Sequence, residues 1–77
     1  MTPTHAVLNV PGISCNHCKM AIENAVGALG GVRLVAVDIA EKSVAVDFDE
    51  AGVTLETIEA AVKEEGYVVA GHSVFGD

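Results

Sequence analysis

The hydrophobic residues of this chain recur with two different periods, and the order of those periods most constrains its fold. A period of two predicts a strand with one buried face, and a period of three to four predicts an amphipathic helix. Within residues 5–10, for example, Ala6, Leu8 and Val10 share one face. The periods predict strands at 5–10, 32–39 and 44–48, helices at 18–29 and 55–62, and a last strand that starts at 67–69.

Polar residues and glycines mark the ends of both helices. Ser14 or Asn16 can cap the start of the first helix, and the pair Gly30–Gly31 can end it in a left-handed conformation. Thr54 is placed to cap the second helix, and Gly66 to end it. No linker or low-complexity stretch interrupts this series, so we expect residues 1–77 to form a single domain.

The order strand, helix, strand, strand, helix, strand predicts an α+β protein with the ferredoxin-like βαββαβ fold. Each half needs a right-handed crossover, and a four-stranded antiparallel sheet with both helices on one face provides both. In that arrangement strands 1 and 3 are central, and strand 4 runs antiparallel beside strand 1. Tyr67 should therefore lie near the loop that carries Cys15, and His5 and His72 should approach each other at the opposite end.

The charge of the chain excludes some classes of partner. The formal net charge is −7, with only four lysines and arginines. Nucleic acids and anionic membranes are poor partners for such a surface. No apolar run approaches the roughly 20 residues that cross a bilayer, and the N-terminal MTPTHAVLNV does not resemble a secretory signal. We expect a soluble cytoplasmic protein with no membrane insertion.

The two cysteines of the chain, Cys15 and Cys18, lie three residues apart in the stretch GISCNHCK, at the start of the first helix. Unpaired N–H groups and the helix dipole stabilise a thiolate there, and Lys19 adds a positive charge. Two soft thiolates without a third soft ligand suit Cu(I). Such a site is open, so an incoming thiolate can bond before an outgoing one leaves. This favours transfer of the metal over storage.

Other uses of the cysteine pair are less well supported. A thioredoxin-like redox pair also opens a helix after a strand, but no Trp accompanies the pair here. A structural zinc site needs four ligands, and the remaining candidates, His5 and His72, are predicted to lie far away. His17, between the cysteines, is a candidate third ligand, although its side chain is expected to point to solvent.

The stretch GISCNHC at 12–18 resembles the GMxCxxC motif of the heavy-metal-associated domain, found in copper chaperones and in the N-terminal domains of copper-transporting ATPases. The resemblance extends to GVRLVAVDI at 31–39, SVAVDFD at 43–49 and EEGYVV at 64–69. It implies the same ferredoxin-like fold, with Cys15 and Cys18 as the metal ligands. Tyr67 resembles the tyrosine that bacterial copper chaperones place beside the site.

Two positions depart from that family pattern. Ile13 stands where the family usually has Met, and Ser14 stands where Thr is common. The Met is thought to anchor the loop from beneath without binding metal. Ile is also apolar but stiffer at χ1, so the loop is expected to be held differently while the ligands stay the same.

The resemblance implies a bacterial-type copper chaperone and not an enzyme. Such a protein would bind one Cu(I) and pass it to the metal-binding domain of a copper-transporting ATPase or to a copper sensor. The open site also allows a copper-bridged homodimer. The initial Met and the short stretch after strand 4 favour a free-standing protein. The alternatives are an N-terminal domain of such an ATPase, a thiol oxidoreductase, and a domain of the same fold for zinc or mercury.

Overall fold

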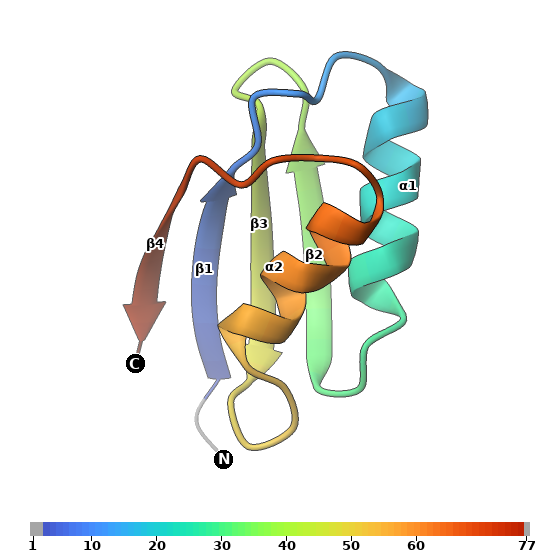
Figure 1. The fold of residues 1–77 in the computed structure, drawn as a ribbon. Helices are drawn as coiled ribbons and strands as arrows, with labels where there is room; N and C mark the ends of the chain where they lie inside the picture. The colour runs from blue at the N-terminus through green and yellow to red at the C-terminus, as the bar shows by residue number, and fades with distance from the viewer. Residues whose placement is uncertain (1–2, 77) are drawn as a thin grey trace.

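Two helices cover one face of a four-stranded antiparallel sheet (Figure 1). The computed structural model describes residues 3–76. Its elements are β1 (Pro3–Asn9), α1 (Asn16–Gly27), β2 (Val32–Asp38), β3 (Ser43–Asp49), α2 (Leu55–Glu64) and β4 (Gly71–Gly76). The predicted ferredoxin-like fold and its order of elements are confirmed. Within residues 3–76, neither helix has the length and apolar character that a bilayer span requires.

Strands β3 and β1 form the centre of the sheet, whose order is β2-β3-β1-β4. β1 pairs antiparallel with both β3 and β4. The register sets Ala6 opposite Val46 and Leu8 opposite Val44, so the apolar residues of two strands share one face. The predicted sheet order, with strands 1 and 3 central and strand 4 antiparallel beside strand 1, is therefore confirmed. This pairing also brings the start of β4 to the end of β1, where the cysteine loop begins.

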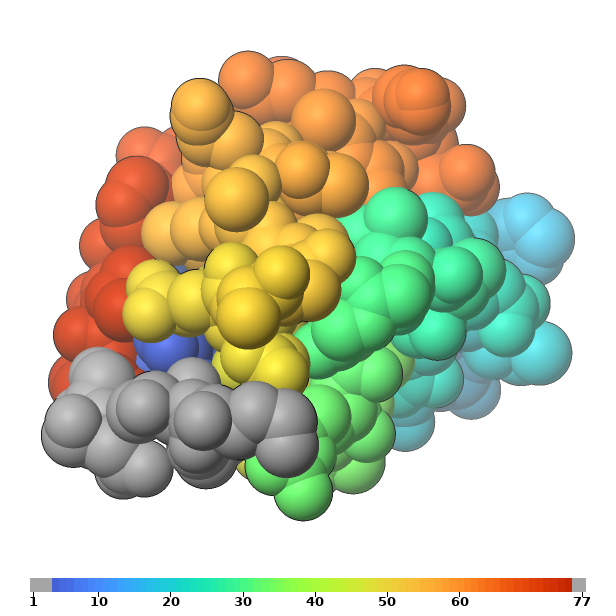
Figure 2. Space-filling view, turned by 90° about the horizontal axis from the view of Figure 1, so that it is seen from below, coloured from blue at the N-terminus to red at the C-terminus, as the bar shows by residue number. Residues whose placement is uncertain are grey.

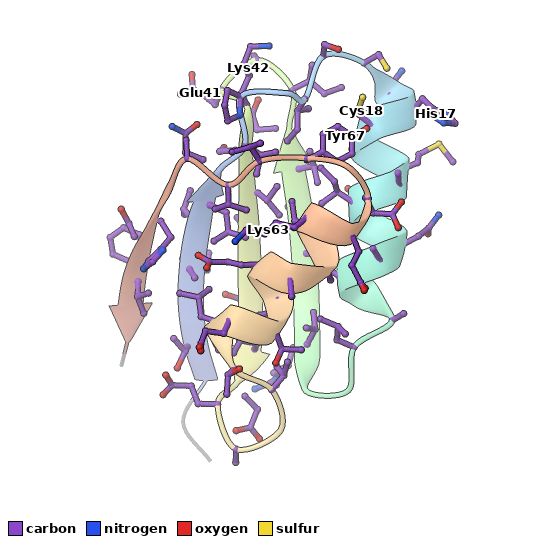
Figure 3. All side chains as sticks on the ribbon, viewed as in Figure 1. His17, Cys18, Glu41, Lys42, Lys63 and Tyr67 are labelled. Atoms are coloured by element: carbon purple, nitrogen blue, oxygen red, sulfur yellow. The ribbon has the colours of Figure 1, made fainter. Side chains whose placement is uncertain are left out.

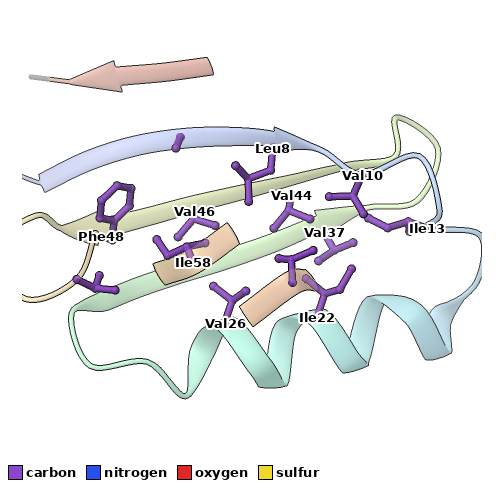
Figure 4. Packing of buried hydrophobic residues seen from close by; sticks show 13 residues of the cluster. Leu8, Val10, Ile13, Ile22, Val26, Val37, Val44, Val46, Phe48 and Ile58 are labelled. Carbon is purple, nitrogen blue, oxygen red and sulfur yellow. The ribbon is translucent and has the colours of Figure 1, made fainter. Parts of the chain in front are cut away.

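The hydrophobic core fills the space between this face of the sheet and the helices (Figure 4). Ile22 and Val26 of α1 and Ile58 and Val62 of α2 are fully buried. They belong to the helical stripes predicted from the sequence, so the apolar period of each helix marks its buried face. Phe48 is the one aromatic residue buried among the aliphatic side chains.

The boundaries of α2 follow the sequence signals. Thr54 is the N-cap, and its hydroxyl accepts a hydrogen bond from the backbone N–H of Thr57 at 3.3 Å. Gly66, with φ +94°, turns the chain away just after the helix. Both predicted end signals are confirmed, because each residue supplies the group or the backbone freedom that a helix end needs.

Three other boundaries differ from the sequence prediction. Helix α1 ends at Gly27 with Ala28 as a right-handed C-cap, so the pair Gly30–Gly31 does not cap it. The N-cap of α1 is Cys15, which is extended and makes no capping hydrogen bond with its side chain, so neither Ser14 nor Asn16 caps this helix. The last strand begins at Gly71 and not at 67–69. Tyr67 and Val69 alternate as strand residues do and pack against the core, but their main chain joins no ladder.

The end of the molecule remote from the cysteines is closed by two connections that touch (Figure 2). The carbonyl of Gly31, in the α1–β2 turn, accepts a hydrogen bond from the N–H of Asp49 at 2.8 Å. Gly31 has φ +99°, and a Cβ there would lie 2.9 Å from the backbone of Gly52. Glycine is therefore required at this contact, which fastens the two halves of the fold together.

β4 forms one edge of the sheet and is less covered than the other strands. Val74 is 47% exposed and Phe75 is 58% exposed. Val74 lies opposite Ala6 and therefore on the helix side of the sheet, whereas Phe75 lies opposite His5 on the other side. The helices thus leave part of this edge strand open to solvent.

The predicted approach of His5 and His72 is wrong. His5 lies opposite Phe75 and His72 lies opposite Leu8, so the two imidazoles stand on opposite faces of the sheet. His5 contacts the carboxylate of Asp47 on β3. His72 Nδ1 lies 2.8 Å from an oxygen of Glu59 on α2. The two histidines therefore form no joint metal site.

Candidate metal centre

The loop between β1 and α1 is anchored by Ile13, whose side chain is fully buried in the core. The N–H of Ile13 donates to the carbonyl of Val10 at 3.2 Å, which closes a tight turn through Pro11 and Gly12. The neighbouring Ser14 and Cys15 are exposed. The burial of Ile13 supports the anchoring position predicted for it. It also fixes the point at which the chain leaves the core and the next residues become exposed.

The two cysteines meet where this loop enters α1. Their sulfur atoms are 3.5 Å apart, so either thiol can donate to the other. This separation is far longer than the roughly 2.05 Å of a disulfide, and both cysteines are free. Cys15 is exposed as the N-cap, whereas Cys18 is half-buried and packs against the core. One sulfur is therefore accessible, and the other is held by the protein.

Tyr67 lies beside Cys18, as the antiparallel pairing of strands 1 and 4 predicts (Figure 3). Its hydroxyl donates a hydrogen bond to the Cys18 sulfur, and its ring lies over Gly12, where an added Cβ would be 3.3 Å from Tyr67 Cδ1. The tyrosine ring thus reaches from the segment that follows α2 and packs against the cysteine loop. Any ion bound at the sulfurs would have this phenol as a neighbour.

Hydrogen bonds make Cys18 an unusually acidic thiol. The Tyr67 hydroxyl, the backbone N–H of Ser14 and the side chain of Cys15 together lower the pKa of Cys18 to about 6. The same contact with Cys18, together with partial burial, raises the pKa of Tyr67 to about 12. At neutral pH Cys18 is therefore mostly a thiolate, the form that binds metal, while Tyr67 keeps its proton.

Lys42, in the β2–β3 turn, also holds the loop, although its sequence context does not predict this role. Its Nζ donates to the carbonyl of Ile13 at 2.8 Å. Its own carbonyl accepts from the N–H of Val10 at 2.9 Å. The partners are about thirty residues apart in sequence, and no local pattern marks such a contact. The fold alone brings them together.

In the part of the chain that the structure describes, no third candidate ligand lies beside the two cysteines. His17 is exposed and projects from the side of α1 away from Tyr67 (Figure 3). Within residues 3–76 no group of three or more His, Cys, Asp or Glu side chains is placed to hold a metal ion. The arrangement is thus a pair of sulfurs open to solvent on one side and not a closed four-ligand site.

Comparisons with known proteins agree with this geometry. Residues 7–68 match the family model described as the heavy-metal-associated domain. A protein named copper chaperone CopZ from Staphylococcus haemolyticus is 43% identical over 63 residues, which cover 82% of this chain and 93% of that protein.

Solved structures of metal-binding proteins also resemble this chain. A putative copper-ion-binding protein from Bacillus anthracis superposes with a TM-score of 0.84 at 43% identity, over 87% of this chain and 94% of that one. The mercury-bound form of MerP, a periplasmic protein of a bacterial mercury detoxification system, superposes with a TM-score of 0.73 at 26% identity, over 94% and 96%. The chain, with its cysteine pair at the start of α1, belongs to the heavy-metal-associated domain family.

Proposed function

We propose that this single-domain protein is a copper chaperone, which carries one Cu(I) on Cys15 and Cys18. The observation that carries the proposal is the separation of the two sulfurs, 3.5 Å, in a member of a heavy-metal-binding family. Two metal–thiolate bonds of about 2.3 Å each span up to about 4.6 Å, so one ion reaches both sulfurs. Relatives named copper chaperones favour copper as the cargo.

The difference between the two cysteines supports transfer by thiolate exchange. Cys18 is held by hydrogen bonds and packing, whereas Cys15 is exposed at the end of a loop. A thiolate of a partner can approach the ion from the open side and form a third bond before a bond to this chain breaks. Cu(I) moves between the soft sulfur ligands of the two proteins. The copper stays Cu(I) throughout, and the cysteines of both proteins stay reduced.

The partner that suits this exchange carries a similar open pair of thiolates. We propose the metal-binding domain of a copper-transporting ATPase, or a copper sensor, as the recipient. A second copy of the chain can fill the same coordination positions, which gives a copper-bridged homodimer. The chain would act as a carrier and not as an enzyme, in the cytoplasm, where thiols stay reduced.

The test is a competition titration of the reduced protein with Cu(I), Zn(II) and Hg(II) against chelators of known affinity. We expect preference for Cu(I) over Zn(II), loss of Cu(I) binding in Cys15→Ser and in Cys18→Ser, and unchanged binding in His17→Ala. The proposal is wrong if Cu(I) affinity survives either cysteine substitution, or if it is no tighter than that of a short dithiol peptide.

Transfer needs its own measurement. The loaded chain is mixed with a metal-free metal-binding domain of a copper-transporting ATPase, and the two proteins are separated and analysed for copper. We expect copper to distribute between them within the mixing time. A chain that exchanges disulfide bonds with a model substrate faster than it passes copper would instead be a thiol oxidoreductase, and one that passes Hg(II) but not Cu(I) would be a mercury carrier.

A further inference from the structure

Lys42 forms a hydrogen bond with the residue at each end of the turn that leads into the cysteine loop. Its main-chain carbonyl accepts from the N–H of Val10 at 2.9 Å, and its Nζ donates to the carbonyl of Ile13 at 2.8 Å. Val10 and Ile13 are themselves joined by the 3.2 Å hydrogen bond that closes this turn. One residue of the β2–β3 turn therefore fixes the first and last residues of another turn.

The carbonyl that Lys42 holds belongs to the same peptide unit as the N–H of Ser14. A peptide unit is planar, and in the trans form its C=O and N–H point in opposite directions. The N–H of Ser14 is one of the groups that donate to the sulfur of Cys18. An ammonium bound to the C=O at one edge of this peptide unit thus directs the N–H at the opposite edge towards the sulfur. The positive charge also polarises the amide and strengthens its donation.

The backbone of Lys42 indicates that its side chain is needed at this position. Lys42 has φ +54° and is the one non-glycine residue with positive φ among residues 3–76. Its N–H donates to the carbonyl of Ile39 at 3.3 Å, so it follows a tight turn at a place where glycine is preferred. A lysine in this conformation carries an energetic cost of backbone strain that a glycine would not. The hydrogen bond of its ammonium to Ile13 offsets that cost.

From this geometry we propose that Lys42 is a positioning residue for metal release, which orients the Ile13–Ser14 peptide so that its N–H faces Cys18. This inference rests on the proposed function of the cysteines as the copper ligands. Lys42 itself touches neither sulfur. It acts through the peptide, and its loss should let the loop move and should speed the departure of the metal.

The experiment uses two variants that remove the ammonium in different ways. Lys42→Gly suits the positive φ, so it keeps the turn and the main-chain bond to Val10 while it deletes the whole side chain. Lys42→Met keeps the side-chain stem without the charge. Lys42→Arg restores a cation that can donate to the Ile13 carbonyl. Lys63→Met on α2 is the matched control, because it changes the net charge equally at a distance from the loop (Figure 3).

Two readouts are measured on each variant. The first is amide hydrogen exchange of Ser14 by NMR in the reduced, metal-free protein. The second is the rate at which Cu(I) passes from the loaded protein to a chelator. Residues that orient a metal ligand commonly change metal affinity about 10- to 100-fold, so we expect both rates to rise about tenfold in Lys42→Gly and Lys42→Met. We expect Lys42→Arg and Lys63→Met to stay close to the parent chain.

The outcomes separate this inference from the proposed function. An unchanged rate of Ser14 amide exchange in both Lys42→Gly and Lys42→Met overturns the positioning role. The role is also overturned if Lys63→Met speeds copper release as much as the Lys42 variants do. A lower melting temperature without a change in either rate would make Lys42 merely structural and would also overturn it. If the parent chain fails to bind Cu(I), the proposed function fails, and the Ser14 readout still decides whether Lys42 orients the peptide.

Discussion

The hydroxyl of Tyr67 donates a hydrogen bond to the sulfur of Cys18, and this one contact moves two pKa values in opposite directions. It is the largest cause that lowers the pKa of Cys18 to about 6, and the largest that raises the pKa of Tyr67 to about 12. A hydrogen bond to a charged acceptor favours the acceptor's ionised form and the donor's protonated form. The pair thus behaves as one unit, a thiolate next to a neutral phenol.

Replacement of Tyr67 by Phe removes this hydroxyl and leaves the ring against Gly12. The hydrogen bond from this hydroxyl is the largest cause of the lowered pKa of Cys18, so we expect that pKa to rise from about 6 towards the ordinary value of a cysteine. The ultraviolet absorbance of the thiolate, followed against pH in the reduced protein, measures it. An unchanged thiol titration in Tyr67→Phe would show that the backbone donors alone set the acidity of Cys18.

The reciprocal change should lower the pKa of Tyr67. In Cys18→Ser the thiolate that accepts from the phenol is gone, so we expect the pKa of Tyr67 to fall from about 12 towards the ordinary value of about 10. The chain has one tyrosine and no tryptophan, so tyrosinate absorbance reports this residue alone. Cys15→Ser is the control and should have a smaller effect, because Cys15 acts on Tyr67 only through its charge.

The acidity of Cys18 makes the stability of the reduced, metal-free protein depend on pH. The pKa of about 6 in the folded protein lies below 9.0, the pKa of an unperturbed cysteine, which is expected for the unfolded chain. Between these values the unfolded state binds more protons, so the free energy of unfolding should rise with pH. This contribution is complete above about pH 9 and is lost as the pH falls through about 6.

Urea unfolding at a series of pH values from 5 to 9 measures this dependence, with Cys18→Ser as the control. The substituted chain should lose most of the rise between about pH 6 and pH 9 that the parent chain shows. Equal slopes for the two chains over this interval would mean that the thiolate is no better stabilised in the folded state than in the unfolded one.

Ile13 should contribute to the stability of the whole fold, although it belongs to the cysteine loop. It is fully buried, so Ile13→Ala should lower the free energy of unfolding by about 2–5 kcal/mol. Ile13→Met keeps most of the buried volume and should cost less than about 1.5 kcal/mol. Urea unfolding of the three proteins checks this. A small loss in Ile13→Ala would mean that the loop can leave the core at little cost.

Gly31 and Gly30 form a matched pair for testing the contact at the other end of the molecule. In Gly31→Ala the new Cβ would meet the backbone of Gly52 at 2.9 Å in a backbone conformation with φ +99°. We expect a loss of at least about 1–2 kcal/mol in the free energy of unfolding. At Gly30 no atom lies within 4 Å of the added Cβ, and Gly30→Ala should stay within about 0.5 kcal/mol of the parent chain. Similar losses in both variants would contradict the close approach.

The order of elements and the neighbourhood of Tyr67 were predictable because both follow from local periodicity and strand direction. Once strand 4 runs antiparallel beside strand 1, the residue before strand 4 must lie near the end of strand 1, and Tyr67 does. Face and register were harder to predict. The prediction that His5 and His72 approach each other was wrong because it used strand direction alone. The register of the pairing, to within one residue, decides on which face of the sheet a side chain lies.

The start of β4 and the role of Lys42 could not be read from local patterns. Residues 67–69 have the alternation of a strand, yet their side chains pack while their main chain passes outside the ladder. Lys42 resembles any polar turn residue in sequence, and only the folded chain shows its ammonium on the carbonyl of Ile13. Contacts between distant turns depend on the three-dimensional arrangement, and the two sequence segments involved carry no signal of one another.

The open edge formed by β4 has a consequence for how the molecules behave towards one another. The strand GHSVFG lacks the lysines and acidic residues with which many proteins keep an edge strand from pairing with another chain. The net charge of −7 that two copies share opposes their approach. Such repulsion extends only about 8 Å at physiological ionic strength and about 3 Å in molar salt. We therefore expect a concentrated solution of this protein to become more prone to association through β4 as the salt concentration rises.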